Sequence, residues 1–390
     1  MSNYKPIEDY ALIGDCHGAA LVARNGDIDW CALGRFDAEP MLFPILDSKR
    51  GGAWSIAIEG STVSRAYEPA SNILRTVFET AGGTVEVLDF MPVGRRADAG
   101  AFDYVTLSCV GWVVRRVRVL SGEVDLTMTF RPGGPNWDRV AGRIALKGHE
   151  ALLERADTPE RCAAFYADGP LSLDEDAKTL TSREKLTKGD VRHYILTAAP
   201  ETSDPFARVE ELRAITHAFW TEWADFCRYD GPHREQVLRS ALALKLLTYA
   251  PTGAIVAAAT TSLPEEIGGE RNWDYRYCWI RDSALTLYAL SAIGYSGEGR
   301  QFSRFLMGQP LPRFTPLQIM YGVHGERALL EENLTHLEGY KGSAPVRIGN
   351  SAHDQLQLDV YGEMLDLAQI RVRLGAKLNP RERTLLSDAA

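Results

Sequence analysis

The hydrophobic pattern of this chain changes near residue 204, and this change limits the folds that the chain can adopt. Before it, short runs of alternating apolar and polar residues flank turn signals such as Asn25-Gly26. After it, apolar residues recur every three or four positions, first over 204–230. Because 390 residues suffice for two domains, the sequence predicts an antiparallel β-sandwich over 1–203, a linker helix over 204–231 and a helical region over 232–390.

Turn residues and helix stop signals bound the individual elements. The predicted strands are 20–23, 28–31, 76–79, 84–88, 113–120, 124–130, 143–146 and 193–196. The predicted helices after the linker are 233–249, 279–293, 301–307, 355–374 and one that begins at 380. Two long loops, 253–272 and 308–354, join these helices, and loops on a rigid frame are where binding sites are usually built.

Composition excludes several classes of function. The net charge of -9 and the pI near 5.5 disfavour a nucleic-acid or anionic-membrane partner. Six scattered cysteines without a CxxC pair predict free thiols in a reducing compartment. Because no apolar leader and no long uncharged apolar run occurs, we expect a soluble cytoplasmic protein. We expect no metal and no cofactor, since His324, His336 and His353 form no HExxH-like pair and no nucleotide motif occurs.

The segment most specific for function is 268–282, GGERNWDYRYCWIRD. Its aromatic residues fall on alternate positions, and arginine and aspartate residues lie among them. Aromatic faces stack on the C–H face of a sugar ring, while Arg and Asp supply paired donors and acceptors for its hydroxyls. The segment therefore predicts a sugar-binding wall. The alternative is a loop packed against the next helix, in whose first turn the helix dipole favours Asp282.

A second polar segment, 342–359, ends a loop and opens a helix. The side chains that can bond vicinal hydroxyls there are Arg347, Asn350, Gln355 and Gln357. The alternative is a helix N-terminus capped by Asn350 or Ser351, with Arg347 on the surface.

The adjacent Glu265 and Glu266 are candidates for acid and base catalysis. Cleavage of a glycosidic bond needs two carboxyl groups across the sugar, roughly 5–10 Å apart. Neighbouring residues of an extended loop point to opposite sides, so we predict a structural or supporting role for both.

Several segments together resemble glycoside hydrolase family 15, the glucoamylase-like and bacterial trehalase-like enzymes. They are NWDYRYCWIRD (272–282), MYGVHGE (320–326), LEGYKGS (337–343) and the stretch from PVRIGN to DVYGE (345–363). IEDYALIGD (7–15) and GDIDW (26–30) resemble the family's opening strands. The resemblance covers nearly the whole chain.

The resemblance implies an N-terminal β-sandwich, a linker helix and an (α/α)6 barrel, of which 232–390 would form an incomplete first part. It implies inverting, exo-acting hydrolysis of an α-glucoside, either trehalose or a maltooligosaccharide. The residues that would bind substrate are Trp273, Tyr275, Trp279, Arg281, Asp282, Arg347 and Asn350. Among them, Trp279 would pack on the terminal glucose, and Arg281 and Asp282 would hold its hydroxyls.

The resemblance also indicates what is missing. The family's catalytic acid lies in a Gly-Ile-Trp-Glu-type motif after the helix matched by 355–374, and its base follows later. This chain has no tryptophan after Trp279, so we identify no catalytic residue in it. We expect the chain alone to be inactive and to expose apolar helix faces that favour self-association.

Three functions are therefore open. The first is an α-glucoside hydrolase, and the second is a non-catalytic carbohydrate-binding protein or remnant. A coding sequence downstream that contains Trp-Glu would separate these two. The third is a structural β-sandwich with a helical tail for a protein partner, which predicts no saturable sugar binding.

Overall fold

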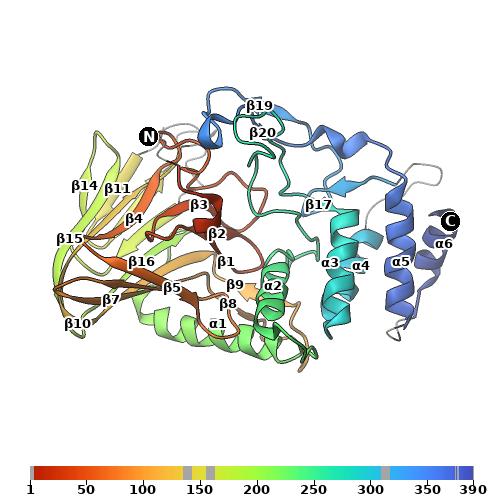
Figure 1. The fold of residues 1–390 in the computed structure, drawn as a ribbon, viewed down its shortest axis with the longest axis horizontal. Helices are drawn as coiled ribbons and strands as arrows, with labels where there is room; N and C mark the ends of the chain where they lie inside the picture. The colour runs from red at the N-terminus through yellow and green to blue at the C-terminus, as the bar shows by residue number, and fades with distance from the viewer. Residues whose placement is uncertain are drawn as a thin grey trace.

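The computed structural model describes residues 4–134, 143–154, 163–308, 317–373, 375 and 377–389. An antiparallel β-rich region occupies one side of the molecule and helices occupy the other (Figure 1). The predicted order, a β-rich N-terminal region followed by a helical region, is confirmed. The domain limits at 203 and 231 stay predictions.

The first sheet is a small antiparallel one. It contains β1 (Ala11–Gly14), β2 (Ala19–Val22) and β3 (Ile28–Ala32), after a 3-10 turn at Ile7–Asp9. The predicted hairpin at Asn25-Gly26 joins β2 and β3, and Gly26 has φ 87°, a conformation that favours glycine.

The larger sheet has the order β11-β12-β13-β16-β10-β7-β6-β5, and β10 also pairs with β4 and β15. Its members are β4 (Ala53–Ile58), β5 (Thr62–Tyr67), β6 (Leu74–Glu79), β7 (Gly83–Phe90), β10 (Trp112–Arg131), β11 (Arg143–Lys147), β12 (Glu150–Glu154), β13 (Ala163–Ala167), β14 (Ser172–Asp174), β15 (Thr179–Thr187) and β16 (Val191–Thr197). A separate hairpin is formed by β8 (Val93–Arg95) and β9 (Leu107–Cys109).

The long strand β10 corrects the sequence prediction, which divided it into 113–120 and 124–130. It is one strand of 20 residues, with a register shift between Val119 and Ser121. Its first half pairs with β7 and β16, and its second half pairs with β4 and β15. Gly122 has φ 70°, and a Cβ there would collide with the backbone of Gly82. The glycine therefore redirects the strand without ending it.

Aromatic side chains and one ion pair fill the space between the pairing partners of β10. Phe130 stacks on Phe165 with ring centres 4.3 Å apart, and Trp54 meets Phe130 edge-on at 5.6 Å. Arg115 of β10 is fully buried and lies 2.8 Å from Asp89 of β7. The positive charge of Arg115 and the negative charge of Asp89 compensate each other inside the core, where an unpaired charge would be very costly.

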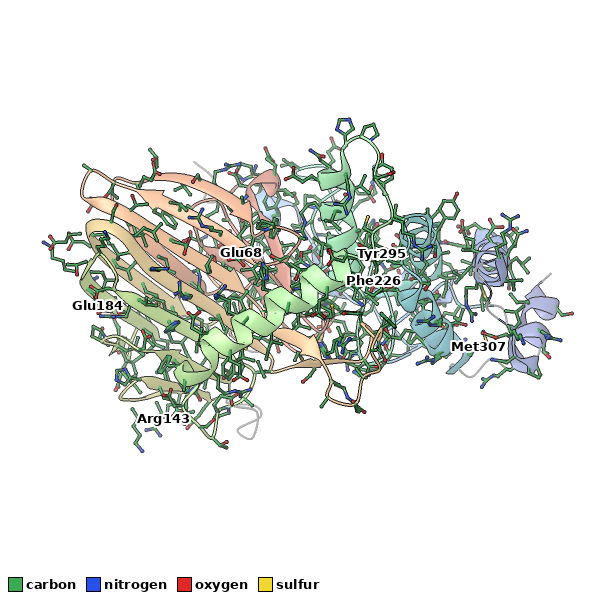
Figure 2. The ribbon with its side chains drawn as sticks, turned by 90° about the horizontal axis from the view of Figure 1, so that it is seen from below. Glu68, Arg143, Glu184, Phe226, Tyr295 and Met307 are labelled. Carbon is green, nitrogen blue, oxygen red and sulfur yellow. The ribbon has the colours of Figure 1, made fainter. Side chains whose placement is uncertain are left out.

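The linker helix predicted over 204–231 is observed as a 3-10 turn (Phe206–Arg208) followed by α1 (Val209–Ala224), which ends seven residues earlier than predicted. Figure 2 shows α1 lying across the β-rich region and ending beside the helices. Its first turns pack Val209 and Leu212 against the sheet, and its last turns pack Trp220 and Trp223 into the helical core. One helix thus joins two cores.

The remaining helices also confirm the sequence prediction in number and order for the described residues. They are α2 (Arg234–Leu246), α3 (Ile280–Ala292), α4 (Gly297–Gly308), α5 (Asp359–Arg373) and α6 (Pro380–Ala389). Helix α5 begins four residues later than predicted, because a 3-10 turn (Ser351–Asp354) and an extended Gln355 precede it. Short elements complete the region: β17 (Cys278–Trp279), β18 (Met320–Tyr321), β19 (Glu332–Leu334), β20 (Val346–Ile348) and a 3-10 turn at Tyr340–Gly342.

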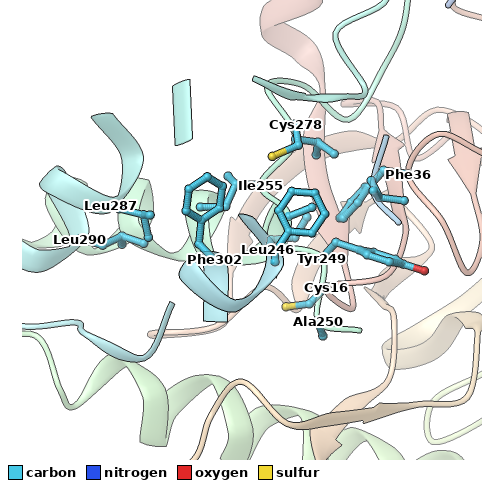
Figure 3. Packing of buried hydrophobic residues seen from close by; sticks show 14 of the residues in the cluster. Cys16, Phe36, Leu246, Tyr249, Ala250, Ile255, Cys278, Leu287, Leu290 and Phe302 are labelled. Carbon is cyan, nitrogen blue, oxygen red and sulfur yellow. The ribbon is translucent and has the colours of Figure 1, made fainter. Parts of the chain in front are cut away.

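The helical core includes residues of the β-rich region. Figure 3 shows Cys16, from the β1–β2 turn, beside Leu246, Tyr249 and Ala250. The Ala250 N–H donates to the Cys16 carbonyl at 2.8 Å. Both regions therefore fold against each other, and the incomplete (α/α)6 barrel stays a prediction.

Some apolar surface is uncovered, as the sequence predicts. Leu285 and Tyr288 of α3 are 56% and 60% exposed. A groove of about 300 Å³ lies between α2 and α3. Self-association through such surfaces stays a prediction.

The five cysteines that the structure describes are all free thiols, and Cys162 lies outside the described residues. None of the helices described is both long and apolar enough to cross a membrane.

Candidate functional site

The entrance of α3 carries the two charged residues at the centre of the predicted sugar wall. The chain is extended at Trp279 (φ -82°, ψ 130°) and becomes helical at Ile280. Arg281 and Asp282 therefore occupy the first helical turn, with side chains 41% and 44% exposed. The helix dipole stabilises the Asp282 carboxylate there.

Arg281 is held in place by the start of α5. Its Nη1 donates to Asp359 Oδ2 at 2.9 Å and to Gln357 Oε1 at 3.3 Å. The hydrogen bond to Asp359 raises the pKa of Arg281, and the same contact lowers the pKa of Asp359. Asp282 lies 3.9 Å from the Arg281 Nε, so the guanidinium is flanked by two carboxylates. The arginine is thereby oriented before any ligand binds.

Two aromatic rings stand beside this charged group. Tyr275 and Trp279 have ring centres 6.1 Å apart, and the Arg281 guanidinium lies 5.7 Å from the Trp279 ring centre. Partial burial raises the pKa of Tyr275, and the carboxylates of Glu265 and Asp282 raise it further. The structure thus brings four predicted site residues together: Tyr275, Trp279, Arg281 and Asp282.

Burial shapes what these groups can do. Partial burial raises the pKa of Asp282, and the positive charge of Arg281 opposes the rise. The Trp279 indole is 8% exposed, and its Nε1 finds no acceptor among the described residues. A guanidinium, a carboxylate and aromatic faces on one small surface can hydrogen-bond hydroxyls and pack on a sugar ring.

Two other charged residues of the same segment are buried and hold the segment in place. Asp274 and Arg276 form a bidentate pair, with Arg276 Nη2 2.7 Å from Asp274 Oδ2 and both side chains buried. Arg276 Nη1 also donates to the carbonyl of Ala38 at 2.8 Å. The sequence grouped these charges with the sugar wall, whereas their contacts anchor the segment to the β-rich region.

The second predicted segment lies directly against the first. Asn350 Nδ2 donates to the Asp274 carbonyl at 3.1 Å, and the Gly349 N–H donates to Tyr277 Oη at 3.1 Å. The two segments are far apart in the sequence, so these bonds hold them side by side in the folded chain.

The side chains of the second segment have partners of their own. Arg347 Nη1 donates to the Glu270 carbonyl at 2.6 Å, and its guanidinium lies 4.5 Å from the Trp273 ring centre. Asn350 is 4% exposed, and its Oδ1 accepts from the Ala352 N–H, which confirms the capping role. Direct contact of Trp273, Arg347 and Asn350 with substrate stays a prediction.

The adjacent glutamates of the preceding loop are exposed. Glu265 lies 3.3 Å from the Arg271 Nε, with side chains 43% and 70% exposed. Sequence reasoning missed Asp359, the residue that orients Arg281. The only signal for it was an aspartate at the start of a predicted helix, a position that many acids share.

Comparison with known proteins shows which family this part of the chain matches. Residues 231–379 match the family model described as glycosyl hydrolases family 15. This range contains the entrance of α3 and all four residues grouped there.

Individual relatives extend the similarity over almost the whole chain. A trehalase of Mycolicibacterium smegmatis is 35% identical over 95% of this chain and 58% of its own length. A trehalase of Mycobacterium tuberculosis is 34% identical over 93% and 55%, and one of Thermoplasma volcanium is 34% identical over 97% and 59%. The chain is thus similar to family 15 glycosyl hydrolases over 231–379 and to these trehalases over nearly all of its residues, and it spans somewhat more than half of their length.

Proposed function

We propose that this chain forms the terminal-glucose subsite of an inverting, exo-acting α-glucoside hydrolase. Its substrate is trehalose or a maltooligosaccharide, and the names of the relatives favour trehalose. The observation that carries the proposal is the first turn of α3, where Arg281 and Asp282 lie exposed beside Tyr275 and Trp279.

Each group has a role that follows from its chemistry. Arg281 donates several fixed N–H groups to vicinal hydroxyl oxygens, and Asp282 accepts from hydroxyl protons. Tyr275 and Trp279 pack on the apolar face of the ring. Asp359 keeps the guanidinium in one orientation, which reduces the entropy lost on binding.

We further propose that the catalytic acid and base lie outside these 390 residues. Inverting hydrolysis needs two carboxyl groups roughly 6.5–9.5 Å apart across the bond. The family's acid belongs to a Trp-Glu motif, and no tryptophan follows Trp279 in this sequence. The chain alone would then bind the sugar without cleaving it.

Five buried or half-buried free thiols support a reducing, cytoplasmic location.

Calorimetric titration of trehalose and of maltotriose into the purified chain tests the subsite. Arg281→Lys and Asp282→Asn should each weaken binding at least roughly tenfold, since hydrogen bonds to charged groups contribute about 1.5–3 kcal/mol. Arg271→Gln is the matched control, because Arg271 is 70% exposed and pairs only with Glu265 among the contacts found. Absence of saturable binding in the wild-type chain would refute the subsite and favour a structural role.

Glucose release, with the anomer followed by NMR, tests the catalytic part separately. We expect none from the chain alone. Release of β-glucose would show that acid and base lie within these residues, and Glu265, Glu266 and Glu270 would then be the first to substitute. Saturable binding without release would fit either a hydrolase fragment or a carbohydrate-binding protein. Restored activity on extension of the chain with a Trp-Glu segment would decide for the hydrolase.

A further inference from the structure

The turn between β1 and β2 brings three metal-ligating side chains together. Asp15 and His17 lie in this turn, and Cys109 is the last residue of β9. One ligand atom from each lies within 4.8 Å of the other two. Cys16 between them has φ 61°, so the backbone turns sharply there and its own thiol points to the Lys245 carbonyl. The sequence showed no such group, because His17 and Cys109 are far apart in it.

Asp15 presents one unused carboxylate oxygen inside the protein. Its Oδ1 accepts from the N–H groups of His17 (2.9 Å) and Gly18 (2.8 Å), which fixes the carboxylate orientation. The side chain is fully buried, and Oδ2 accepts no N–H or O–H hydrogen bond from the residues that the structure describes, while the Cys109 thiol is a side-chain donor that faces this carboxylate. A buried carboxylate oxygen without an N–H or O–H donor is costly unless a cation or proton occupies the position.

The backbone holds one ring nitrogen of His17. Its Nδ1 lies 3.0 Å from the Asp15 carbonyl, and a carbonyl can only accept, so Nδ1 donates to it and a metal would be bound through Nε2. A backbone carbonyl on the second ring nitrogen is the usual support of metal-binding histidines. The ring edge also packs on Tyr249, with ring centres 5.9 Å apart.

We propose that Asp15, His17 and Cys109 bind one divalent cation of the zinc class. Zinc bonds of about 2.0–2.3 Å in a tetrahedron place ligand atoms about 3.3–3.6 Å apart. Because the three ligand atoms lie within 4.8 Å of one another, side-chain movements of about 1 Å would bring them to this spacing. A thiolate with an imidazole selects Zn²⁺ over Mg²⁺ or Ca²⁺, which prefer oxygen ligands. Because His17 and Cys109 are only partly buried, solvent can reach the site and water can fill the fourth position.

The cation would tie the β1–β2 turn to β9. Cys16 of this turn packs into the helical core beside Tyr249 (Figure 3), so the site lies where the two regions meet. Binding would also place a positive charge against the buried Asp15 carboxylate. We therefore expect Zn²⁺ to stabilise the folded chain.

Metal titration of the full, tag-free chain tests the proposal. After dialysis against a chelator, Zn²⁺ alone is titrated in competition with a chromogenic chelator, and Co²⁺ is used as a spectroscopic substitute. We expect one ion per chain, thiolate-to-Co²⁺ charge-transfer absorption and the visible bands of tetrahedral Co²⁺. A chain that binds no Zn²⁺ would overturn the proposal.

Three variants identify the ligands. Cys109→Ser should abolish the charge-transfer band, and Asp15→Asn should weaken Zn²⁺ binding about 100-fold or more, since even supporting residues of metal sites contribute 10–100-fold. Asp15→Asn keeps an acceptor for the turn N–H groups, so it preserves the fold, which circular dichroism verifies. Cys227→Ser removes a thiol outside the cluster and should bind like the wild type. Binding that survives both Cys109→Ser and Asp15→Asn is adventitious and overturns the assignment.

Discussion

The ion pair between Lys245 and Glu298 allows a quantitative test of how the helical core is held together. Lys245 Nζ lies 2.8 Å from Glu298 Oε1, and the two side chains are 1% and 3% exposed. Trp223 Nε1 donates to the same oxygen at 3.0 Å, and Lys245 donates to the Tyr104 carbonyl at 2.7 Å. The pair thus connects α1, α2, α4 and the segment before β9.

Glu298→Gln keeps the size of the side chain and removes its charge. It leaves an ammonium group in a site closed to water, and breaking a buried pair in this way costs about 3–5 kcal/mol.

Urea unfolding followed by tryptophan fluorescence measures the loss, because Trp220 and Trp223 lie in this core. The matched control is Glu210→Gln on α1, whose ion pair with Arg116 is half-exposed and is expected to contribute at most about 1 kcal/mol.

A double-mutant cycle completes the test. Lys245→Met and Glu298→Leu are each made alone and together, and the double variant, which removes both charges, should lose much less stability than the two single variants added. A loss below about 1 kcal/mol in Glu298→Gln, or a double variant whose loss equals the sum of the single losses, would refute the reasoning.

Three other predictions concern the site and the sheets. Asp359→Asn should weaken trehalose binding roughly tenfold in calorimetry, because Arg281 loses a charge-assisted anchor; unchanged affinity would argue against a positioning role. The pKa of Asp359 is lowered by Arg281, so the ion pair is present at neutral pH and lost only as the pH falls through that lowered value, and NMR titration of the carboxyl should give a midpoint below about 3.9. Arg115→Met leaves Asp89 buried and unpaired and should cost about 3–5 kcal/mol in urea unfolding, whereas Asn350→Ala, which removes a cap and the hydrogen bond to the Asp274 carbonyl, should cost about 2 kcal/mol.

Local signals allowed much of the fold to be predicted. The hairpin formed by β6 and β7 combines alternating residues with a glycine turn, and helices α3 and α5 end two residues before Gly294 and Gly375. The division of β10 failed because Gly122 is a turn signal when read alone. Whether the strand continues depends on β4 and β15, which pair with its second half and lie elsewhere in the sequence.

The residues at the centre of the proposed site could be predicted from the sequence, whereas the residues that hold them in place could not. The alternation around Tyr275 and Trp279 shows that neighbouring residues face opposite sides, which the geometry of extended chain requires. The alternation does not show which of the charged side chains are buried in the core. Arg276 is buried because the Ala38 carbonyl lies opposite it, and that contact arises only in the folded chain. The cluster of Asp15, His17 and Cys109 was not predicted for the same reason, because motif spacing reveals only ligands that are close in sequence and Cys109 is far from the other two.

These contacts make the β-rich region part of the proposed sugar site. The extended segment before α3 presents Tyr275 and Trp279 on one side, and on the other it is fixed by Asp274 and Arg276. Arg276 lies between the two aromatic residues in sequence, and its bond to Ala38 holds the backbone that orients both. If the β-rich region were removed, Arg276 would lose this acceptor and its side chain would be exposed to water. The aromatic wall is therefore positioned from both regions, and neither region alone is expected to preserve it.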